Sequence, residues 1–418
     1  MGQMGRMGRM GRIGRMRRFG AGVPAIPIAA VWLAVQAMFP GPQAASENWV
    51  TAWGTSQQAL GTTAVSNATV RMMARVSIPG DAVRIRLDNT YGSAPVRIGK
   101  AYVGWRRAGA TIFPGSNRPV LFSGAGEVSV PAGGSVVSDP VALKVRARQD
   151  LAVSLYIPDD VRPSQHGNSV VTSFLSASGG GDSAADESAQ AFTRTTTAGL
   201  WLKAIDVQSP TTRGAIVAFG DSITEGSCAT VDGHDRWPDW LALRLDLDGR
   251  RMAVVNEGIG GNTLLTKHPD PVPSAGMPGL ERLDRDVLSH HGVTHVVLFL
   301  GTNDLRRSAS AAMLIEGIQS VVSRLKARGL RTYGATLVPR HNNQQIPWDA
   351  AKTQQRNALN EWIRTKGPFD GVLDFDKIVR DESDRDRLNP TFDCDGIHPS
   401  PLGYFEMGKS VRLDFFGR

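Results

Sequence analysis

Cysteine is scarce in this sequence: Cys228 and Cys394 are the only two among 418 residues. Neither has cysteine or histidine neighbours at the spacing of a zinc-binding motif, so we expect no metal site built on them. In an oxidising compartment the pair supplies at most one disulfide bond.

Acidic residues are missing from the first 45 positions, which hold six of the 47 Lys and Arg residues. The formal net charge of +8 and the pI near 9.8 come largely from this segment, because the remaining chain is nearly neutral. A basic face of the kind that binds nucleic acid mostly disappears with the segment. We therefore expect no nucleic-acid partner.

Residues 1–45 have the three parts of a secretory signal peptide: an arginine-rich start, an apolar stretch from Ala21 to Met38, and small residues that suit cleavage. The alternative is an uncleaved membrane anchor, which Pro24, Pro27 and the limited length of the apolar stretch disfavour. The sequence predicts a secreted or periplasmic protein with no stable membrane partner once the leader is removed. The start and the cut stay open, the alternatives being Met16 for the start and Ala37, Ala44 or Ala45 for the cut.

Residues 46–210 have the pattern of an antiparallel β-domain. Apolar and polar residues alternate in 83–105 and 150–158, and 127–139 has hairpin character. The serine-rich and glycine-rich segment 176–190 is expected to be a flexible loop. No amphipathic helix interrupts the strands, so the sequence predicts a β-sandwich or jelly roll, followed by a second domain at 211–418.

From residue 211 the pattern alternates between buried strands and amphipathic helices, which predicts a parallel sheet with helices on both faces. The strands are expected at 214–219, 252–259, 294–300, 330–338 and 371–375, and the helices at 235–246, 280–290, 310–329, 350–365 and 402–416. In such an open sheet, ligands bind beyond the carboxyl ends of the strands, where helix N-termini point outward. The residues that follow each strand are therefore the candidates for a site.

Candidate site residues follow four of these strands. The first strand runs into Ser222, the second into Gly261, the third into Asn303, and the fifth leads to Asp395 and His398. A serine hydroxyl needs an imidazole to take its proton, and a carboxylate holds that imidazole in the right tautomer. Backbone and side-chain amides supply the donors that the oxyanion of acyl transfer requires. These residue types together predict a serine-dependent acyl-transfer site.

In order and spacing, four blocks of the sequence resemble those of the SGNH hydrolases, also called GDSL esterases/lipases. The blocks are GDS at 220–222, NEGIGGN at 256–262, GTND at 301–304 and DGIH at 395–398. The resemblance covers residues 214–412, about half of the chain. It implies a flavodoxin-like α/β fold and ester hydrolysis that needs neither a metal ion nor an organic cofactor.

The family roles transfer residue by residue. Ser222 resembles the nucleophile, His398 the base, and Asp395 the acid that orients the base. Gly261 and Asn303 resemble the oxyanion donors, and from the residues alone we expect the backbone N–H of Ser222 to supply a third.

The blocks leave smaller questions. Gly260 and Gly261 are both glycines, and alignment of the block from its first asparagine favours Gly261 as the donor. The first block reads Gly-Asp-Ser-Ile rather than Gly-Asp-Ser-Leu, which preserves an apolar residue, and no Gly-x-Ser-x-Gly turn of an α/β-hydrolase occurs. Asp221 and Asp304 are expected to support the loops by hydrogen bonds. No catalytic role is assigned to His268, His290, His291, His295 and His341.

The two cysteines flank the candidate site. Cys228 lies six residues after Ser222, and Cys394 directly precedes Asp395. If Ser222 meets His398, both cysteines reach the same mouth of the site. We therefore hypothesise a disulfide that joins the two loops, the alternative being two free buried thiols.

Together these features predict an exported serine esterase that hydrolyses short acyl esters, including O-acetyl groups on carbohydrate. Lipid-type esters are the alternative within this class. Two other classes stay open: a glycan-binding protein on a degenerate hydrolase fold, and an anion-binding flavodoxin-like module. The N-terminal β-domain is expected to be a scaffold that shapes the entrance, with Trp53 and Trp105 as the candidates if it binds polysaccharide.

Overall fold

The computed structural model describes residues 48–269, 275–341 and 348–417. The predicted leader lies outside the described residues. The described residues form one compact unit, and the predicted division near residue 210 stays a prediction. None of the described helices is long and apolar enough to cross a membrane.

As far as Gln208, the regular secondary structure of the described chain consists of antiparallel strands. They are β1 (Trp49–Gly54), β2 (Ala59–Leu60), β3 (Ala68–Val76), β4 (Ala82–Asp88), β5 (Val96–Ile98), β6 (Lys100–Ala108), β7 (Thr111–Ile112), β8 (Arg118–Val120), β9 (Val128–Val130), β10 (Ser135–Val137), β11 (Gln149–Ile157), β12 (Ser164–His166), β13 (Ser173–Leu175), β14 (Arg194–Thr196), β15 (Gly199–Leu200) and β16 (Leu202–Gln208). One sheet has the order β1-β16-β4-β10, and a larger one has the order β14-β13-β3-β11-β6-β7 with β8 beside β6. Two small sheets, β15-β12-β2 and β5-β9, complete this part. The antiparallel arrangement is confirmed, whereas the sandwich or jelly-roll topology stays a prediction.

The centre of the larger sheet is buried on both faces. β3 and β11 pair over nine residues, and Met72 joins the main core while Met73 faces a smaller apolar cluster. Arg71 shares the face of Met73 and is fully buried. Its guanidinium donates to the carbonyl oxygens of Ser183, Asp186 and Ser188. The segment 176–190, expected to be a loop, indeed has no helix or strand, and this arginine ties it to the sheet.

The hairpin predicted at 127–139 is wrong. β9 and β10 flank the turn, but β9 pairs with β5 and β10 pairs with β4. Gly133, with a φ of +66°, lets the chain reverse between them. Turn residues indicate where the chain reverses, whereas the partner of each strand depends on packing outside the local sequence.

Five parallel strands follow. They are β17 (Gly214–Gly220), β18 (Met252–Gly258), β19 (Val293–Phe299), β20 (Arg331–Ala335) and β21 (Gly371–Leu373). Their order is β18-β17-β19-β20-β21, which is the order of flavodoxin-like folds, with the switch point between β17 and β19. All seven residues of β17 are buried, as expected for a strand that helices cover on both sides. The predicted parallel sheet and its five strands are confirmed.

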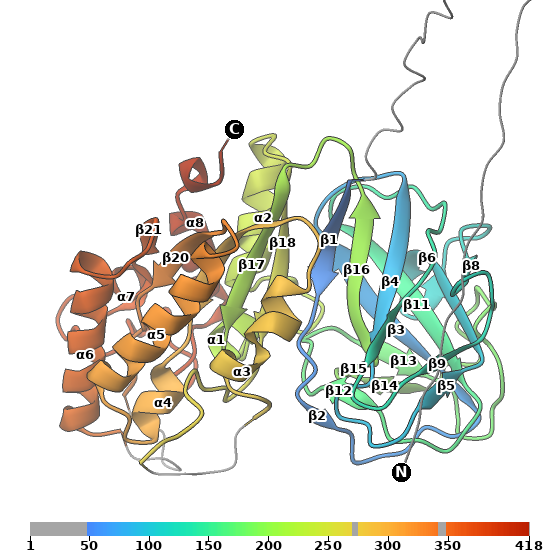
Figure 1. The fold of residues 1–418 in the computed structure, drawn as a ribbon, viewed down its shortest axis with the longest axis horizontal. Coiled ribbons are helices and arrows are strands. Elements are labelled where there is room, and N and C mark those ends of the chain that lie inside the picture. The colour runs from blue at the N-terminus through green and yellow to red at the C-terminus, as the bar shows by residue number, and fades with distance from the viewer. Residues whose placement is uncertain (1–47, 270–274, 342–347, 418) are drawn as a thin grey trace, which may run out of the picture. The chain divides into compact units, whose positions relative to one another are not determined.

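Helices lie on both faces of this sheet (Figure 1). They are α1 (Ser222–Glu225), α2 (Trp237–Leu247), α3 (Gly279–Leu283), α4 (Thr302–Arg306), α5 (Ala311–Lys326), α6 (Ala350–Thr365), α7 (Phe375–Val379) and α8 (Pro401–Ser410), with a π-helical turn at Asp284–Leu288 and a 3₁₀ turn at Leu413–Phe416. α5 contacts α3 and α6, whereas α2 contacts α8. The two groups of helices cover opposite faces.

The last helix ends earlier than its sequence pattern predicts. α8 stops at Ser410 rather than at residue 416. Arg244, on α2, donates to the carbonyl oxygens of Gly408 and Val411 at 2.9 and 2.7 Å. Because this side chain satisfies carbonyl groups at the helix end, no further turn is needed there.

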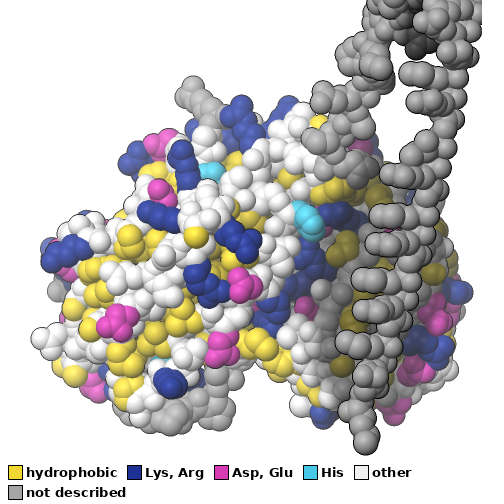
Figure 2. Space-filling view, viewed as in Figure 1, with side chains coloured by type: hydrophobic (Ala, Val, Ile, Leu, Met, Phe, Trp, Pro, Cys, Tyr) yellow, Lys and Arg dark blue, Asp and Glu magenta, His cyan; other side chains and the backbone are white. Residues whose placement is uncertain are grey.

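The antiparallel and parallel sheets meet along β1 and β18, which lie side by side (Figure 1). Oγ of Ser77 accepts the N–H of Val254 at 3.0 Å, and the N–H of Thr51 donates to the carbonyl oxygen of His291 at 3.0 Å. Buried hydrogen bonds therefore join the two parts. Basic and acidic side chains are interspersed over the face shown in Figure 2, as the nearly neutral composition after the leader suggests.

Candidate active site

Ser222 begins the short helix α1 directly after β17. Asp221 caps this helix, since its Oδ1 accepts the N–H of Ile223 at 3.0 Å. Gly226 ends it with a φ of +108°, a conformation that favours glycine. Because the strand is buried along its whole length and the helix turns at once, Ser222 stays at the carboxyl edge of the sheet, 7% exposed.

Ser222, His398 and Asp395 form a hydrogen-bonded chain. Nε2 of His398 lies 2.9 Å from Oγ of Ser222, and Nδ1 of His398 lies 2.8 Å from Oδ2 of Asp395. Oδ1 of Asp395 accepts the backbone N–H groups of His398 and Ile397 at 2.9 and 3.0 Å. The local turn therefore fixes the carboxylate, and the carboxylate fixes the imidazole beside the hydroxyl, as in a nucleophile, base and acid set.

Asp395 is held in its ionised form. Burial acts to raise the pKa of this carboxyl group, but the hydrogen bonds from the side chain and backbone of His398 outweigh burial and lower the pKa to about 2. The carboxylate is charged at neutral pH and is able to stabilise an imidazolium at His398.

Gly261 and Asn303 lie on the loops after β18 and β19. Gly261 has a φ of +72°, and a Cβ there would lie 3.3 Å from Cβ of Ala275. Asn303 is 4% exposed, and its amide donates one N–H to the carbonyl oxygen of Asn262 at 3.0 Å. The amide keeps a second N–H, and no acceptor among the described residues takes the backbone N–H of Gly261 or Ser222. These donors remain free for a ligand.

Asp304 ties the loop after β18 to α4. Its fully buried carboxylate accepts the N–H groups of Leu264 and Leu265 at 2.9 Å and lies 2.8 Å from Nε2 of His268. These contacts are the supporting role that the sequence predicts for Asp304.

Asp221 is buried next to Ser222, and burial raises its pKa to about 7. The N–H of Ile223 and the charge of His398 oppose this shift, whereas the carboxylate of Asp304 adds to it. This carboxyl group therefore changes its charge near neutral pH, next to Ser222.

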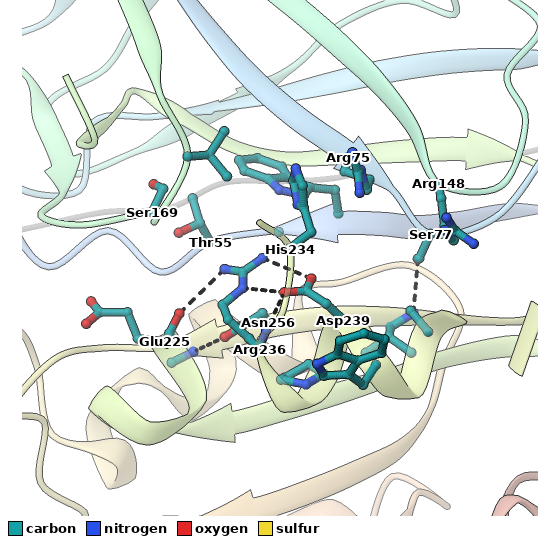
Figure 3. A pocket seen from close by; sticks show the side chains of 18 of the residues that line it. Thr55, Arg75, Ser77, Arg148, Ser169, Glu225, His234, Arg236, Asp239 and Asn256 are labelled. Carbon is teal, nitrogen blue, oxygen red and sulfur yellow. Dashed lines mark hydrogen bonds and ion pairs between the residues drawn. The ribbon is translucent and has the colours of Figure 1, made fainter. Parts of the chain in front are cut away.

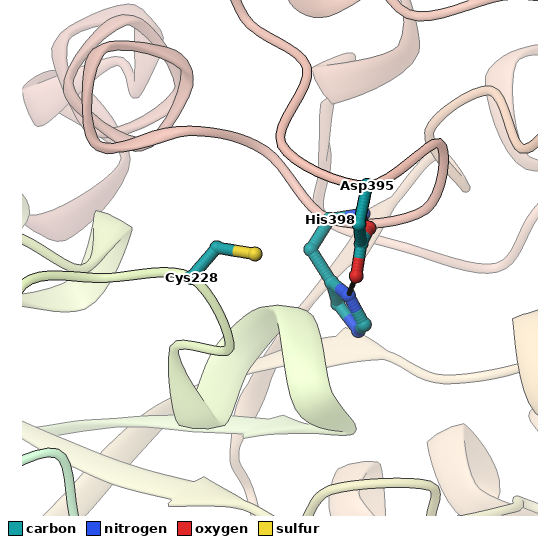
Figure 4. Close-up of side chains that lie close together, drawn as sticks. All are labelled: Cys228, Asp395 and His398. Atoms are coloured by element: carbon teal, nitrogen blue, oxygen red, sulfur yellow. Dashed lines mark hydrogen bonds and ion pairs between the residues drawn. The ribbon is translucent and has the colours of Figure 1, made fainter. Parts of the chain in front are cut away.

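Cys228 and Cys394 are joined by a disulfide bond across a sequence separation of 166 residues. The bond confirms the hypothesised pairing and joins the segment after α1 to the residue before Asp395. The sulfur of Cys228 and one ligand atom each of Asp395 and His398 lie within 4.8 Å of one another (Figure 4). A disulfide sulfur is not a thiolate, so this cluster does not offer the ligands of a metal site.

A buried arginine outside the predicted site residues lies beneath the loop that carries Gly261. Arg282, on α3, is fully buried. Its guanidinium donates to the carbonyl oxygens of Gly220 and Glu257 at 2.8 and 2.9 Å and to Oδ1 of Asn262 at 3.0 Å. It therefore holds the ends of β17 and β18 and the loop that carries Gly261.

The antiparallel part supplies partners for this arginine. Lys203, on β16, lies 3.4 Å from Glu257 and 2.5 Å from Asp286. Ser56 donates to Glu257 at 2.5 Å and accepts from Arg282 at 3.0 Å. Burial acts to raise the pKa values of Glu257 and Asp286, yet the Lys203 cation helps to hold both below their usual values. The buried charges thus compensate one another across the junction of the two parts.

The sequence holds one weak signal of this network. Arg282 and Asp286 lie four residues apart, beside Leu283 and Val287, and all four are buried. Charged residues on the buried side of a helix need partners. No local pattern connects them to residues 56, 203 and 257.

One comparison, with a family model, covers all four sequence blocks. Residues 218–404 match the GDSL-like Lipase/Acylhydrolase family model. Among solved structures, a carbohydrate acetylesterase family member from Sinorhizobium meliloti is 20% identical, with 48% of this chain and 97% of that chain covered and a TM-score of 0.39. A GDSL-like lipase from Bacteroides thetaiotaomicron is 20% identical (48% and 87% covered, TM-score 0.37), and the inhibitor-bound aryl esterase of M. smegmatis is 19% identical (49% and 99% covered, TM-score 0.37). A comparison with curated proteins gave no match. The family match confirms the resemblance.

Proposed function

Because residues 218–404 belong to the GDSL-like lipase/acylhydrolase family of ester-cleaving hydrolases, we propose that this protein is a serine esterase with Ser222 as its nucleophile. The observation that carries the proposal is the hydrogen-bonded chain from Oγ of Ser222 through His398 to Asp395. It places a base within reach of the hydroxyl proton and an ionised carboxylate behind the base.

In the first half-reaction, Oγ of Ser222 attacks the ester carbonyl carbon while Nε2 of His398 takes the hydroxyl proton. Asp395 stabilises the resulting imidazolium through the N–H at Nδ1. The carbonyl oxygen becomes an oxyanion and accepts hydrogen bonds from the N–H groups of Ser222 and Gly261 and from Asn303. The ester C–O bond then breaks, His398 returns the proton to the leaving alcohol, and the acyl group stays on Ser222.

In the second half-reaction, water attacks the acyl carbon while His398 takes a proton from the water. The same donors stabilise the second oxyanion. Collapse releases the carboxylic acid, and the proton on His398 returns to Oγ of Ser222, so the enzyme is restored.

Short acyl esters are the proposed substrates, with O-acetyl groups on carbohydrate as the proposed class. Ser222 is 7% exposed and Asn303 is 4% exposed, so little of either side chain is open to solvent. A short acyl group reaches such side chains with less rearrangement of the surrounding loops than a long chain does. The proposal includes export of the enzyme, which depends on the leader expected at residues 1–45.

The test is hydrolysis of p-nitrophenyl esters from acetate to palmitate by the wild type and by Ser222→Ala. We expect kcat/KM to be highest for the shortest esters and kcat to fall roughly 10⁴-fold or more in the variant. Equal rates for the two proteins would contradict the mechanism, and a maximum at palmitate would contradict the substrate class.

A fluorophosphonate probe separates the esterase from a non-catalytic glycan-binding protein. The probe is expected to add one label to the wild type, on the peptide that contains Ser222, and none to Ser222→Ala. Thermal unfolding of the variant serves as the control for its fold. A wild type that stays unlabelled would support the binding protein instead.

A further inference from the structure

A cavity of about 230 Å³ lies where the antiparallel part meets α2. Strands β1 and β3 contribute one side, and α2, β18 and the loop before α2 contribute the other (Figure 3). Ser222, Asp395 and His398 are not among its lining residues. The esterase mechanism uses none of the side chains that line it, so the cavity is a separate feature of the molecule.

Two tryptophan side chains line this cavity, Trp53 from β1 and Trp240 from α2. Trp240 is held in place, because its Nε1 donates to the carbonyl oxygen of Asp235 at 3.0 Å and its ring packs edge-on against Phe405 at 4.9 Å between centroids. Both tryptophans are only partly buried. Indole rings of this kind offer flat apolar surface beside polar groups, which is the surface that the C–H faces of a sugar ring bind.

Polar atoms without partners also line the cavity. Nδ1 of His234 and Oγ of Ser169 are shielded from solvent and have no hydrogen-bond partner among the described residues. The His234 side chain is 6% exposed, and its φ of +48° is a strained conformation of the kind that functional sites hold. Figure 3 labels both residues. Buried polar atoms are normally paired, so hydroxyl groups of a ligand would complete this lining.

One cationic side chain of the lining has no acidic partner among the described residues. Arg75 pairs with Asp150, which lies outside the lining, Arg236 pairs with Asp239, and His166, when protonated, pairs with Glu225. Arg148 also lines the cavity, is exposed, and has no ion-pair or hydrogen-bond partner among the described residues. A guanidinium in this state is suited to bind a carboxylate.

We propose that this cavity binds a sugar ring that carries a carboxylate, such as a uronic acid unit of a polysaccharide. Trp53 and Trp240 contact the apolar faces of the ring, His234 and Ser169 pair with its hydroxyl groups, and Arg148 binds the carboxylate. The cavity is a second site of the enzyme, and binding there does not require ester hydrolysis.

The full-length Ser222→Ala protein is the material for the test, because it separates binding from turnover. D-glucuronate, D-glucose and benzoate are titrated at constant ionic strength, and binding is followed by calorimetry and by tryptophan fluorescence. We expect saturable glucuronate binding with a Kd on the order of 1 mM. Binding of glucose and of benzoate is expected to be about tenfold weaker, because glucose lacks the carboxylate and benzoate lacks the sugar hydroxyl groups.

Variants locate the site. In the Ser222→Ala background, Arg148→Gln is expected to lower the glucuronate affinity about tenfold and leave that for glucose unchanged. Arg146→Gln makes the same charge change on a neighbouring exposed arginine outside the cavity and should have no effect. Trp53→Ala is expected to abolish binding of both sugars, whereas Trp105→Ala, outside the cavity, retains it.

The proposal is overturned by several clear results. If glucuronate does not bind saturably, the proposed site does not exist. If Arg148→Gln and Arg146→Gln lower the glucuronate affinity equally, the effect comes from general electrostatics and not from the cavity. If benzoate binds as tightly as glucuronate, the cavity recognises an aromatic acid and not an acidic sugar. If Trp53→Ala fails to fold, Arg148→Gln still tests the proposal, because the Arg148 side chain is exposed and its replacement should not disturb the fold. These binding measurements do not depend on hydrolysis, so they test the cavity even if the wild type does not hydrolyse esters.

Discussion

Nε2 of His398 lies 2.9 Å from Oγ of Ser222, although 176 residues separate the two in the chain. Ser222 is fixed by a short helix on a buried strand, and His398 is fixed by the turn that Asp395 ties together. Neither local structure reaches the other by itself. The contact therefore depends on what joins the two loops, and one such connection is covalent.

Removing the disulfide is expected to loosen this contact. Replacement of Cys228 and Cys394 by serine frees a long loop in the unfolded chain, so the free energy of unfolding should fall by about 2–5 kcal/mol. We expect kcat for p-nitrophenyl acetate to fall more than KM rises, because the hydroxyl and imidazole lose their alignment. Urea unfolding and steady-state kinetics measure the two effects. Wild type treated with dithiothreitol should behave like the variant, and unchanged stability in both would contradict the prediction.

Removing the side-chain donor at Asn303 should slow the chemical step. Asn303→Ala is expected to lower kcat by about 10²–10³-fold with little change in KM, because in the proposed mechanism the amide acts on the oxyanion rather than on the bound ester. Asn357→Ala, an exposed asparagine on α6, is the control and should keep wild-type kinetics. A rise in KM at constant kcat would assign Asn303 to substrate binding instead.

Contiguous blocks made much of the site predictable from the sequence. The buried run before Ser222 and the short spacing of Asp395 and His398 are local signals, and the structure brings these three residues together as expected, although their catalytic roles stay a prediction. The prediction of a hairpin at 127–139 is wrong because strand partners depend on distant packing. The roles of Arg282 and Lys203 could not be predicted because their partners come from segments that only the fold places together.

The buried network should support activity as well as stability. Ser56→Ala removes a donor to Glu257 and an acceptor for Arg282, so the free energy of unfolding should fall by about 1–3 kcal/mol. We expect kcat to fall too, because the variant removes a contact that positions Arg282, and Arg282 in turn donates to Asn262 in the loop that carries Gly261. Urea unfolding and kinetics with p-nitrophenyl acetate test both parts.

Arg71→Met is the matched control for that prediction. Arg71 is fully buried like Arg282, but its hydrogen-bond partners lie in the antiparallel part alone. The variant leaves buried carbonyl oxygens without a donor, so it should lose stability, by about 1–3 kcal/mol for each group left unpaired, while the folded fraction keeps its kcat. A drop in kcat for Arg71→Met equal to that for Ser56→Ala would show a general loss of stability rather than a contact with the site.

Asp221 should make the protein less stable as the pH rises, whereas a carboxylate in an ion pair makes a protein more stable. Its pKa is raised from 3.8 to about 7 in the folded protein by burial. Between these two values the folded protein holds a proton that the unfolded chain has released. Raising the pH through this window therefore favours unfolding, and the stability that the protonated carboxyl contributes below it is lost by about pH 7.

Asp221→Asn removes this titration, while its side-chain oxygen still accepts the N–H of Ile223. Relative to the wild type, the variant should gain free energy of unfolding on the order of 2–4 kcal/mol between about pH 4 and pH 8. His398, Asp304 and Arg340 also act on this carboxyl group, and they are present in both proteins, so the difference isolates residue 221. Urea unfolding of the two proteins across this range measures it. Parallel pH dependences would mean that Asp221 is already ionised at the low end, and its carboxylate would then be a fixed charge beside Ser222.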